Sequence, residues 1–272
     1  MGQVVETLPE GAPVAGVTSL GEEIYLLRGK AIDQVEVYEV ISYRLVRCLT
    51  VPNARGFNDM TSCPDVLCLF ICDSMAESVH RLNLPSGNAT SWPVNDRPSS
   101  LSVNARHSVI VTCSRVGKIK EFSPRGELLR DVTLPGDVIN PWHAVQLRCG
   151  EFVVCHGGDD PSHGVSRLSW DGRRVVHSHA GQPGSDAGQY DVPYHLAVDD
   201  DEFVFVSDRN NRRVTLLSPT LGEVGGVVSR NQFKWKVQRL CLDVVGRRLY
   251  VTDNERKDGE YTAGRCVVFR LQ

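Results

Sequence analysis

One structural unit recurs along the sequence, and this repetition constrains the fold more than any other feature. The stretch 109–124 (VIVTCSRVGKIKEFSP) aligns without a gap with 204–219 (VFVSDRNNRRVTLLSP); each has two β-rich runs around a polar loop and ends in Ser-Pro. Related copies are found at 24–40, 69–87, 152–172 and 248–271, and a short apolar run precedes each copy. The third residues of these six runs lie 41 to 52 residues apart: Ala15, Asp59, Ser100, His143, His195 and Arg239.

Each period holds four short strands separated by turn residues, which is typical of a β-propeller blade. Sustained helical periodicity is missing, so we expect almost no helix. The sequence therefore predicts an all-β fold, a six-bladed β-propeller of four-stranded antiparallel blades in one domain, 1–272. The expected blades are approximately 12–54, 55–96, 97–138, 139–182, 190–232 and 235–272 plus 1–9.

The two ends of the sequence predict how the ring closes. The last unit stops after its third run, CVVFRLQ, without a fourth. The opening GQVVETLP resembles GELLRDVTLP at 126–135, which is the expected fourth strand of the third unit. A four-stranded unit has two uncovered faces and must pack on neighbours. We therefore expect residues 1–9 to supply the missing strand of the last blade.

The segment 181–219 (GQPGSDAGQYDVPYHLAVDDDEFVFVSDRNNRRVTLLSP) resembles an NHL repeat. It has the Gly-rich approach, an aromatic residue, Pro, Leu-Ala-Val-Asp, Val-x-Asp and Asn-x-Arg-Val. The resemblance is fair over the third, fourth and sixth units and poor over the first two, so it covers about two-thirds of the chain. It implies a six-bladed propeller, as in tripartite-motif proteins, that binds protein or RNA. RING, B-box and coiled-coil segments are missing from this sequence, which is either a stand-alone propeller or one domain of a longer protein.

Loops that enter the inner strand of each blade share a face with the loops between its second and third strands. The main hypothesis is that this face binds a protein or peptide partner, without catalysis and without a cofactor. We expect the anchors to be aromatic and cationic side chains, which dominate binding energy at many interfaces. The predicted binding face comprises Asp59, Trp142, His143, Tyr194, His195, Arg209, Arg212, Arg230, Lys234, Trp235, Lys236, Arg239 and Arg256. The loop 156–163 is longer than its counterparts and is a further candidate.

A second hypothesis places a hydrolase or lyase in the channel, with Asp59, His143 and His195 as candidate metal ligands or acid–base groups. One relative of the NHL family tests this hypothesis: peptidyl-amidoglycolate lyase is an NHL-like propeller whose zinc histidines directly follow a proline. Here Trp142 and Tyr194 follow the prolines and the histidines come one residue later. One step along a strand reverses the side-chain direction, so those ligands do not carry over.

A third hypothesis is single-stranded RNA binding by the last third of the chain. Eleven basic and six acidic residues lie between 208 and 258, and SRNQFKWKVQR interleaves cations with Phe233 and Trp235. Cations beside aromatic rings suit stacked, unpaired bases. A solvated loop face with Trp235 packed between blades explains the same pattern.

Composition excludes several classes of function. Thirty basic and 33 acidic residues among 272 give a net charge of −3, which does not favour nucleic acid or anionic membrane for the chain as a whole. The N-terminal segment has neither the basic nor the apolar region of a signal peptide. Nine cysteines, several inside apolar runs, predict free thiols in a reducing compartment. We expect a monomeric cytoplasmic domain without a membrane span.

Overall fold

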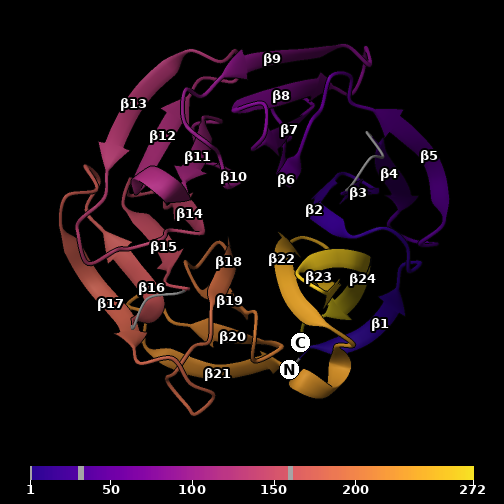
Figure 1. Ribbon diagram of the computed structural model, residues 1–272. Coiled ribbons are helices and arrows are strands. Elements are labelled where there is room, and N and C mark those ends of the chain that lie inside the picture. Colours follow the sequence, from indigo (N-terminus) through magenta and orange to yellow (C-terminus); the bar gives the residue numbers. More distant parts are fainter. Residues whose placement is uncertain (1, 30–33, 159–161) are drawn as a thin grey trace.

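The computed structural model describes residues 2–29, 34–158 and 162–272. Over these residues the chain forms six four-stranded antiparallel sheets arranged as blades around one axis (Figure 1). Two 3₁₀ turns, η1 (Ser114–Val116) and η2 (Arg230–Gln232), are the helical elements of this part of the chain. No helix among the described residues is long and apolar enough to cross a bilayer. The predicted all-β, six-bladed architecture is confirmed.

Each blade runs from the axis to the rim in chain order. The innermost strands are β2 (Val14–Leu20), β6 (Phe57–Cys63), β10 (Ser100–Val103), β14 (His143–Gln146), β18 (Pro193–Val198) and β22 (Lys236–Asp243). The second strands are β3 (Glu23–Arg28), β7 (Cys68–Asp73), β11 (Val109–Cys113), β15 (Phe152–His156), β19 (Val204–Asp208) and β23 (Arg248–Lys257). The third strands are β4 (Gln34–Glu39), β8 (Ser78–Asn83), β12 (Lys118–Phe122), β16 (His163–Leu168), β20 (Arg213–Leu217) and β24 (Glu260–Arg270). The rim strands are β5 (Leu45–Thr50), β9 (Ala89–Pro93), β13 (Leu128–Thr133), β17 (Val175–Gly181), β21 (Glu223–Val228) and, in blade 6, β1 (Gln3–Thr7).

The hydrophobic core lies between the blades. Alternate residues of a strand face opposite sides, so in β7 Phe70 packs against blade 3 while Leu69 and Ile71 pack against blade 1. Each of the six contacts between neighbouring blades contains one such cluster of buried side chains in the described part of the chain. This two-sided burial explains why the second strands are continuous apolar runs in the sequence.

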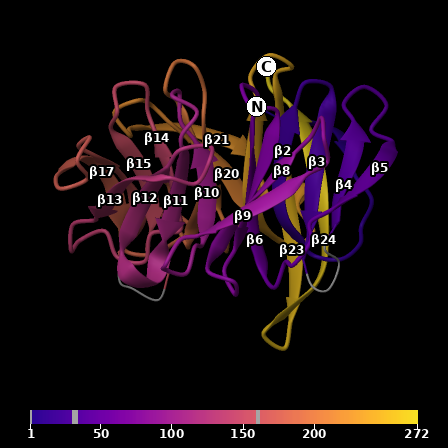
Figure 2. The same cartoon turned by 90° about the horizontal axis from the view of Figure 1, so that it is seen from above.

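The N-terminal strand closes the ring, as predicted. β1 pairs antiparallel with β24, with Gln3 opposite Arg270 and Thr7 opposite Val267. Figures 1 and 2 show the two termini close together at this blade. Leu8, only 1% exposed, enters the cluster between blades 6 and 1.

A buried arginine holds the closure from the side of blade 1. The Arg28 side chain donates to the carbonyl oxygens of Pro9 (2.9 Å), Ala12 (2.9 Å) and Gly264 (3.1 Å). It also forms an ion pair with Glu36 at 2.9 Å. One guanidinium therefore joins the N-terminal segment to the blade that it completes.

The disc has two distinct faces. The inner strands begin, and the second strands end, on the face that we call the hairpin face, because the long β23–β24 hairpin projects from it (Figure 2). The turns that leave the inner strands lie on the opposite face, and the termini lie toward that side (Figure 2).

Removal of the closing strand should destabilise the protein. Deleting residues 1–9 exposes the edge of β24 and the core between blades 6 and 1, so we expect a large drop in the melting temperature. The Leu8→Ala substitution should cost about 2–5 kcal/mol in the free energy of unfolding, the range for a fully buried leucine. The matched control is Val4→Ala in the same strand, because Val4 is 40% exposed. Equal unfolding midpoints for both variants and the parent protein in urea would contradict the closure.

Candidate functional site

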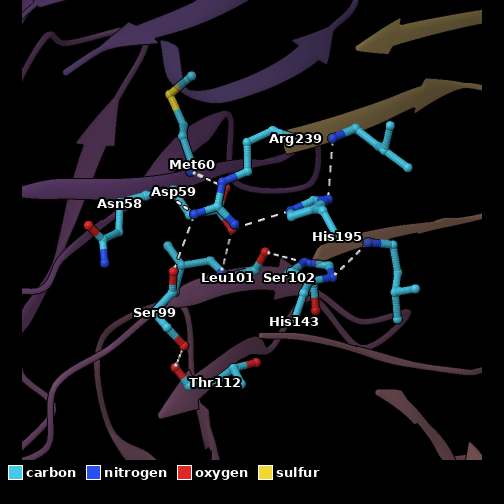
Figure 3. A network of polar contacts seen from close by, with 12 residues as sticks. Asn58, Asp59, Met60, Ser99, Leu101, Ser102, Thr112, His143, His195 and Arg239 are labelled. Carbon is cyan, nitrogen blue, oxygen red and sulfur yellow. Dashed lines mark hydrogen bonds and ion pairs between the residues drawn. The ribbon is translucent and has the colours of Figure 1, made fainter. Parts of the chain in front are cut away.

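The third residues of the inner strands converge on the axis, as the repeat alignment predicts. Asp59, His143, His195 and Arg239 come from β6, β14, β18 and β22, and all four are buried. Their side chains point toward one another and form one polar network (Figure 3). We call these four residues the axial network. The corresponding residues of blades 1 and 3 are Ala15 and Ser100, whose side chains are short and uncharged.

Asp59 lies at the centre of the axial network. Its Oδ2 accepts the backbone N–H of Leu101 in the next blade at 2.9 Å. The same oxygen lies 3.4 Å from Nε2 of His195, and Oδ1 lies 3.5 Å from Nε of Arg239. The Asp59 carboxylate therefore joins inner strands of blades 2, 3, 5 and 6.

The two histidines are stacked and are each bonded at both ring nitrogens. Their ring centroids are 3.7 Å apart. Nδ1 of His143 accepts the Leu196 N–H, and Nδ1 of His195 accepts the Leu240 N–H, both at 3.3 Å. Because each Nδ1 accepts, the ring proton must be on Nε2. Nε2 of His143 then donates to the Leu101 carbonyl at 3.1 Å, and Nε2 of His195 donates to Asp59.

Arg239 completes the connection around the ring. It donates to the backbone carbonyls of Ala15 (3.1 Å), Ser99 (3.4 Å) and Asn58. These carbonyls belong to the inner segments of blades 1, 3 and 2. The axial network thus contacts the backbone or side chains of all six blades, and it acts as a polar counterpart to the apolar clusters farther out.

Burial and mutual contacts shift the pKa values of the axial network. Burial by itself raises the pKa of the Asp59 carboxyl, but the Arg239 guanidinium and His195 outweigh it and hold this pKa at about 2. Burial lowers the pKa of His143 well below its usual range, and the adjacent His195 adds to the effect. Burial also lowers the pKa of His195, although Asp59 acts in the opposite direction. At neutral pH the network therefore holds one carboxylate, one guanidinium and two neutral imidazoles.

The axial network resembles a metal site in composition but not in its hydrogen bonds. One ligand atom from each of Asp59, His143 and His195 lies within 4.8 Å of the others. A metal needs an unprotonated ring nitrogen. The unprotonated nitrogen of each imidazole is Nδ1, and it already accepts a hydrogen bond from the backbone N–H of Leu196 or Leu240. Coordination of a metal through Nε2 would move each ring proton to Nδ1. The Nδ1–H of each histidine would then face the backbone N–H of Leu196 or Leu240, donor against donor, so these residues do not fit a resident metal.

Above the axial network, aromatic and cationic side chains gather on the hairpin face. We call Trp142, Tyr194, Arg209, Lys236, Arg256 and Tyr261 the mouth cluster. The Tyr194 ring lies 5.2 Å from that of Trp142, and the guanidinium carbons of Arg209 and Arg239 are 5.2 and 4.9 Å from its centroid. Arg209 donates to the Tyr261 hydroxyl at 2.6 Å.

A β-bulge positions Tyr194 at the mouth. The pairing of β18 with β19 shifts between Pro193 and His195, so Tyr194 has no partner residue in the ladder. A bulge re-aims side chains. As a result, consecutive residues both reach the axis: His195 contacts Asp59, while Tyr194 contacts Arg239. Strict alternation, which we assumed for the sequence, does not hold at this point.

Other predicted binding-face residues are dispersed. Lys234 forms an ion pair with Glu10 at 2.9 Å, and its ammonium lies 4.2 Å from the Trp235 centroid. Arg230 lies in η2 and lines a separate cleft with Gly2 and Gln232, outside the mouth cluster. Arg212 follows β19 in the same loop as Arg209 and is partly exposed. Residues 159–161 of the long loop lie outside the described residues.

Two acidic residues of the second strands, one in blade 5 and one in blade 6, have a structural role. Asp208 and Asp253 are fully buried. Asp208 accepts the Asp191 N–H at 2.8 Å and pairs with Arg213 at 2.8 Å. Asp253 likewise accepts the N–H groups of Lys234 and Trp235 and pairs with Arg265. These carboxylates fix the loops that enter blades 5 and 6, and their oxygens are engaged in those contacts.

Tyr261 is the member of the mouth cluster that the sequence did not indicate. It lies in β24, where the hairpin with β23 is longer than in the other blades, and it is paired with Arg256 across the hairpin. The available signal was the length of the loop between the two β-rich runs of the last unit, 254–264 (NERKDGEYTAG), with its single aromatic residue.

Comparisons with known proteins identify the fold alone. No protein-family profile and no curated protein matches this sequence. A catalytically inactive virginiamycin B lyase from Staphylococcus aureus with quinupristin superposes with a TM-score of 0.67 at 11% identity, over 96% of this chain and 82% of that one. A PQQ-bound aldose sugar dehydrogenase from Streptomyces coelicolor gives 0.69 at 12% identity, over 98% of both chains. A protein of unknown function from Bacteroides caccae gives 0.62 at 14% identity, over 84% and 85%.

These neighbours place the chain among propellers. It is a six-bladed β-propeller. At such identities the comparison does not extend to chemistry, since one fold hosts many activities.

We expect the stability of the protein to fall below pH 6.5. The unfolded histidines take up protons near pH 6.5, whereas the folded pKa values of His143 and His195 are lower, so acid favours unfolding. The loss for His143 should approach about 1.4 kcal/mol per pH unit. Urea unfolding between pH 7.5 and 5 should show a steeper decline for the parent protein than for His143→Gln. Parallel curves would show that His143 does not titrate differently on folding.

The ion pair at the axis can be tested by removing one charge or both. Asp59→Asn leaves the Arg239 guanidinium buried without a carboxylate, and we expect a loss of about 3–5 kcal/mol. The double variant Asp59→Asn/Arg239→Met removes both charges and should recover part of this loss. Urea unfolding at pH 7 measures the free energy of unfolding of Asp59→Asn, Arg239→Met and the double variant. A loss in the double variant equal to the sum of the losses in the two single variants would argue against direct coupling.

Proposed function

We propose that this propeller is a non-enzymatic binding module that holds an acidic segment of a partner protein against the mouth cluster. The observation that carries the proposal is a local excess of positive charge. Arg209, Lys236 and Arg256 form no ion pair with any acid in the described part of the chain. Three other cations of blades 5 and 6 are compensated, Arg213 by Asp208, Arg265 by Asp253 and Lys234 by Glu10, whereas Arg212 and Arg230 lie outside the mouth cluster.

The excess charge also affects Lys236 itself. Burial lowers the pKa of its ammonium group, and repulsion from Arg209 and Arg256 lowers it further. The Asp191 carboxylate raises this pKa but does not outweigh the other effects. The Lys236 ammonium donates to Asn210 at 2.7 Å, which is a neutral partner. Cations held close together without counter-charges favour the binding of an anion.

The aromatic members of the mouth cluster suit a peptide ligand. Trp142, Tyr194 and Tyr261 are all partly exposed around the cations. Aromatic side chains and arginine are the commonest anchors of protein interfaces, since they add large contact areas with few rotatable bonds. Carboxylate side chains of a partner would meet the cations while its apolar atoms cover the rings.

The axial network supports a binding role over catalysis. A general base needs a free lone pair within reach of a substrate. In both histidines that lone pair accepts a backbone N–H, and the Asp59 carboxylate contacts Arg239, His195 and Leu101. These side chains are engaged in joining blades, and we therefore assign them to stability.

RNA binding is the less favoured alternative because the basic stretch of the sequence does not form a continuous track. Arg213, Lys234, Arg248 and Lys257 are ion-paired, and Arg239 pairs with Asp59 at the axis. Arg247 lies in the turn between β22 and β23 on the opposite face. A compact basin of positive charge suits a short anionic segment better than an extended strand of nucleotides. The NHL-like pattern of blade 5, which contains Tyr194 and Arg209, agrees with a binding role.

An acidic peptide should bind and should require the three uncompensated cations. The probe is a fluorescein-labelled degenerate peptide mixture rich in Glu and Asp, followed by fluorescence anisotropy at 50 mM salt. We expect the triple variant Arg209→Gln/Lys236→Gln/Arg256→Gln to weaken binding at least about tenfold, since each charged contact contributes on the order of 1 kcal/mol or more. Rising salt should weaken binding by the parent protein.

The control variant changes the same charge on the other side of the disc. Arg106, Arg173 and Arg247 are exposed in turns of the opposite face. Their triple substitution by Gln should leave the affinity unchanged. Equal losses in both variants, or retention of labelled single-stranded RNA in preference to the acidic peptide, would overturn the proposed function.

A further inference from the structure

The mouth cluster concentrates more positive charge than a single carboxylate can balance. Arg209, Lys236 and Arg256 contribute three charges at the point where β19, β22 and β23 reach the hairpin face. Of the acids close to them, Glu255 is paired with Lys257, whereas Asp191 accepts only the neutral Asn210 side chain and offsets one of the three charges. One ligand that balances this charge must carry about two negative charges in a small volume.

The tyrosine rings hold the arginine side chains in place. Arg209 lies over Tyr194 and donates to the Tyr261 hydroxyl, while the guanidinium carbon of Arg256 is 5.9 Å from the Tyr261 centroid. Stacking on rings uses the faces of the guanidinium groups and leaves their N–H groups to hydrogen-bond at the edges. Nε of Arg256 donates to the Gly259 carbonyl at 2.9 Å, so its terminal N–H groups are the ones that a ligand would use. Nε of Arg209 is buried and has no acceptor among the described residues.

Guanidinium edges match phosphate geometry. A phosphoryl group on serine or threonine carries a charge of about −1.5 to −2 at pH 7 and presents three acceptor oxygens. Arginine binds such a group through two parallel N–H···O bonds, and lysine adds a point charge. A carboxylate offers one charge and two oxygens, so even with Asp191 nearby it would leave part of the positive charge uncompensated.

We propose that the acidic segment held by the mouth cluster is phosphorylated, with one phosphoserine or phosphothreonine bound among Arg209, Lys236 and Arg256. This inference rests on the proposed function and specifies its ligand. Tyr194 and Trp142 are placed to contact the residues that flank the phosphorylated one, because their rings border the cations and remain partly exposed. A phosphopeptide therefore uses both the charge and the apolar surface of the site.

Three degenerate peptide mixtures of equal length test the inference. They carry phosphoserine, glutamate or serine at a fixed central position and a fluorescein label, and binding is measured by fluorescence anisotropy. We expect the phosphoserine mixture to bind at least about tenfold more tightly than the glutamate mixture, and the serine mixture to bind weakest. Inorganic phosphate, added as a competitor, should displace the phosphoserine peptides only at concentrations far above theirs.

Substitution of one arginine tests the geometry separately from the charge. Arg209→Lys keeps the charge but removes the planar pair of donors. We expect it to weaken phosphoserine binding about tenfold and glutamate binding far less. The triple variant of the opposite face, at Arg106, Arg173 and Arg247, should behave like the parent protein, and thermal melting confirms that each variant is folded.

The outcomes separate the two proposals. If the glutamate mixture binds as tightly as the phosphoserine mixture, the phosphate inference is wrong and the acidic-peptide function stands. Binding by none of the mixtures overturns both. Inorganic phosphate that competes at the same concentration as the phosphopeptide would contradict the peptide as the occupant.

Discussion

Each blade of this protein is apolar on both faces, and this single constraint organises the rest of the structure. A second strand such as β7 is buried along its whole length, with alternate residues facing the two neighbouring blades. No blade can satisfy both faces alone, so every blade needs two neighbours and the array must close. Closure is provided by β1, which adds the fourth strand to the sheet that contains the last three strands of the chain.

The same packing creates the polar axis. Inner strands meet where the blades converge, and their backbone N–H and C=O groups would be buried without partners there. Buried polar groups without partners cost several kcal/mol. Asp59, His143, His195 and Arg239 satisfy them by accepting from or donating to the inner segments of other blades. A group of residues that resembles an active site in composition is thus explained by backbone hydrogen bonds.

The candidate binding site arises where one hairpin departs from this regular plan. The long β23–β24 hairpin brings Tyr261 to Arg209, and a bulge that recurs at the start of the inner strands of blades 1, 2 and 6 places Tyr194 beside Arg209. Elsewhere on the hairpin face the repeated aspartates neutralise the cations that follow them, as Asp208 does for Arg213. Arg209, Lys236 and Arg256 have no such acidic partner among the described residues, and the proposed ligand would supply one.

The repeat, with its short apolar runs and turn residues, was sufficient to predict the fold, including the strand order of the blades and the closing strand, because both depend on patterns that are local in the sequence. The convergence of Asp59, His143, His195 and Arg239 also followed, since equivalent positions of a closed ring must face one axis. The sequence did not reveal which ring nitrogen of His143 carries the proton, that Asp208 is buried, or that Tyr261 lies beside Arg209. Those properties depend on hydrogen bonds and ion pairs between residues up to about 50 positions apart and on a bulge that shifts the register by one residue. Only the tertiary structure decided them, because charge compensation and side-chain direction are set by spatial neighbours and not by residue type.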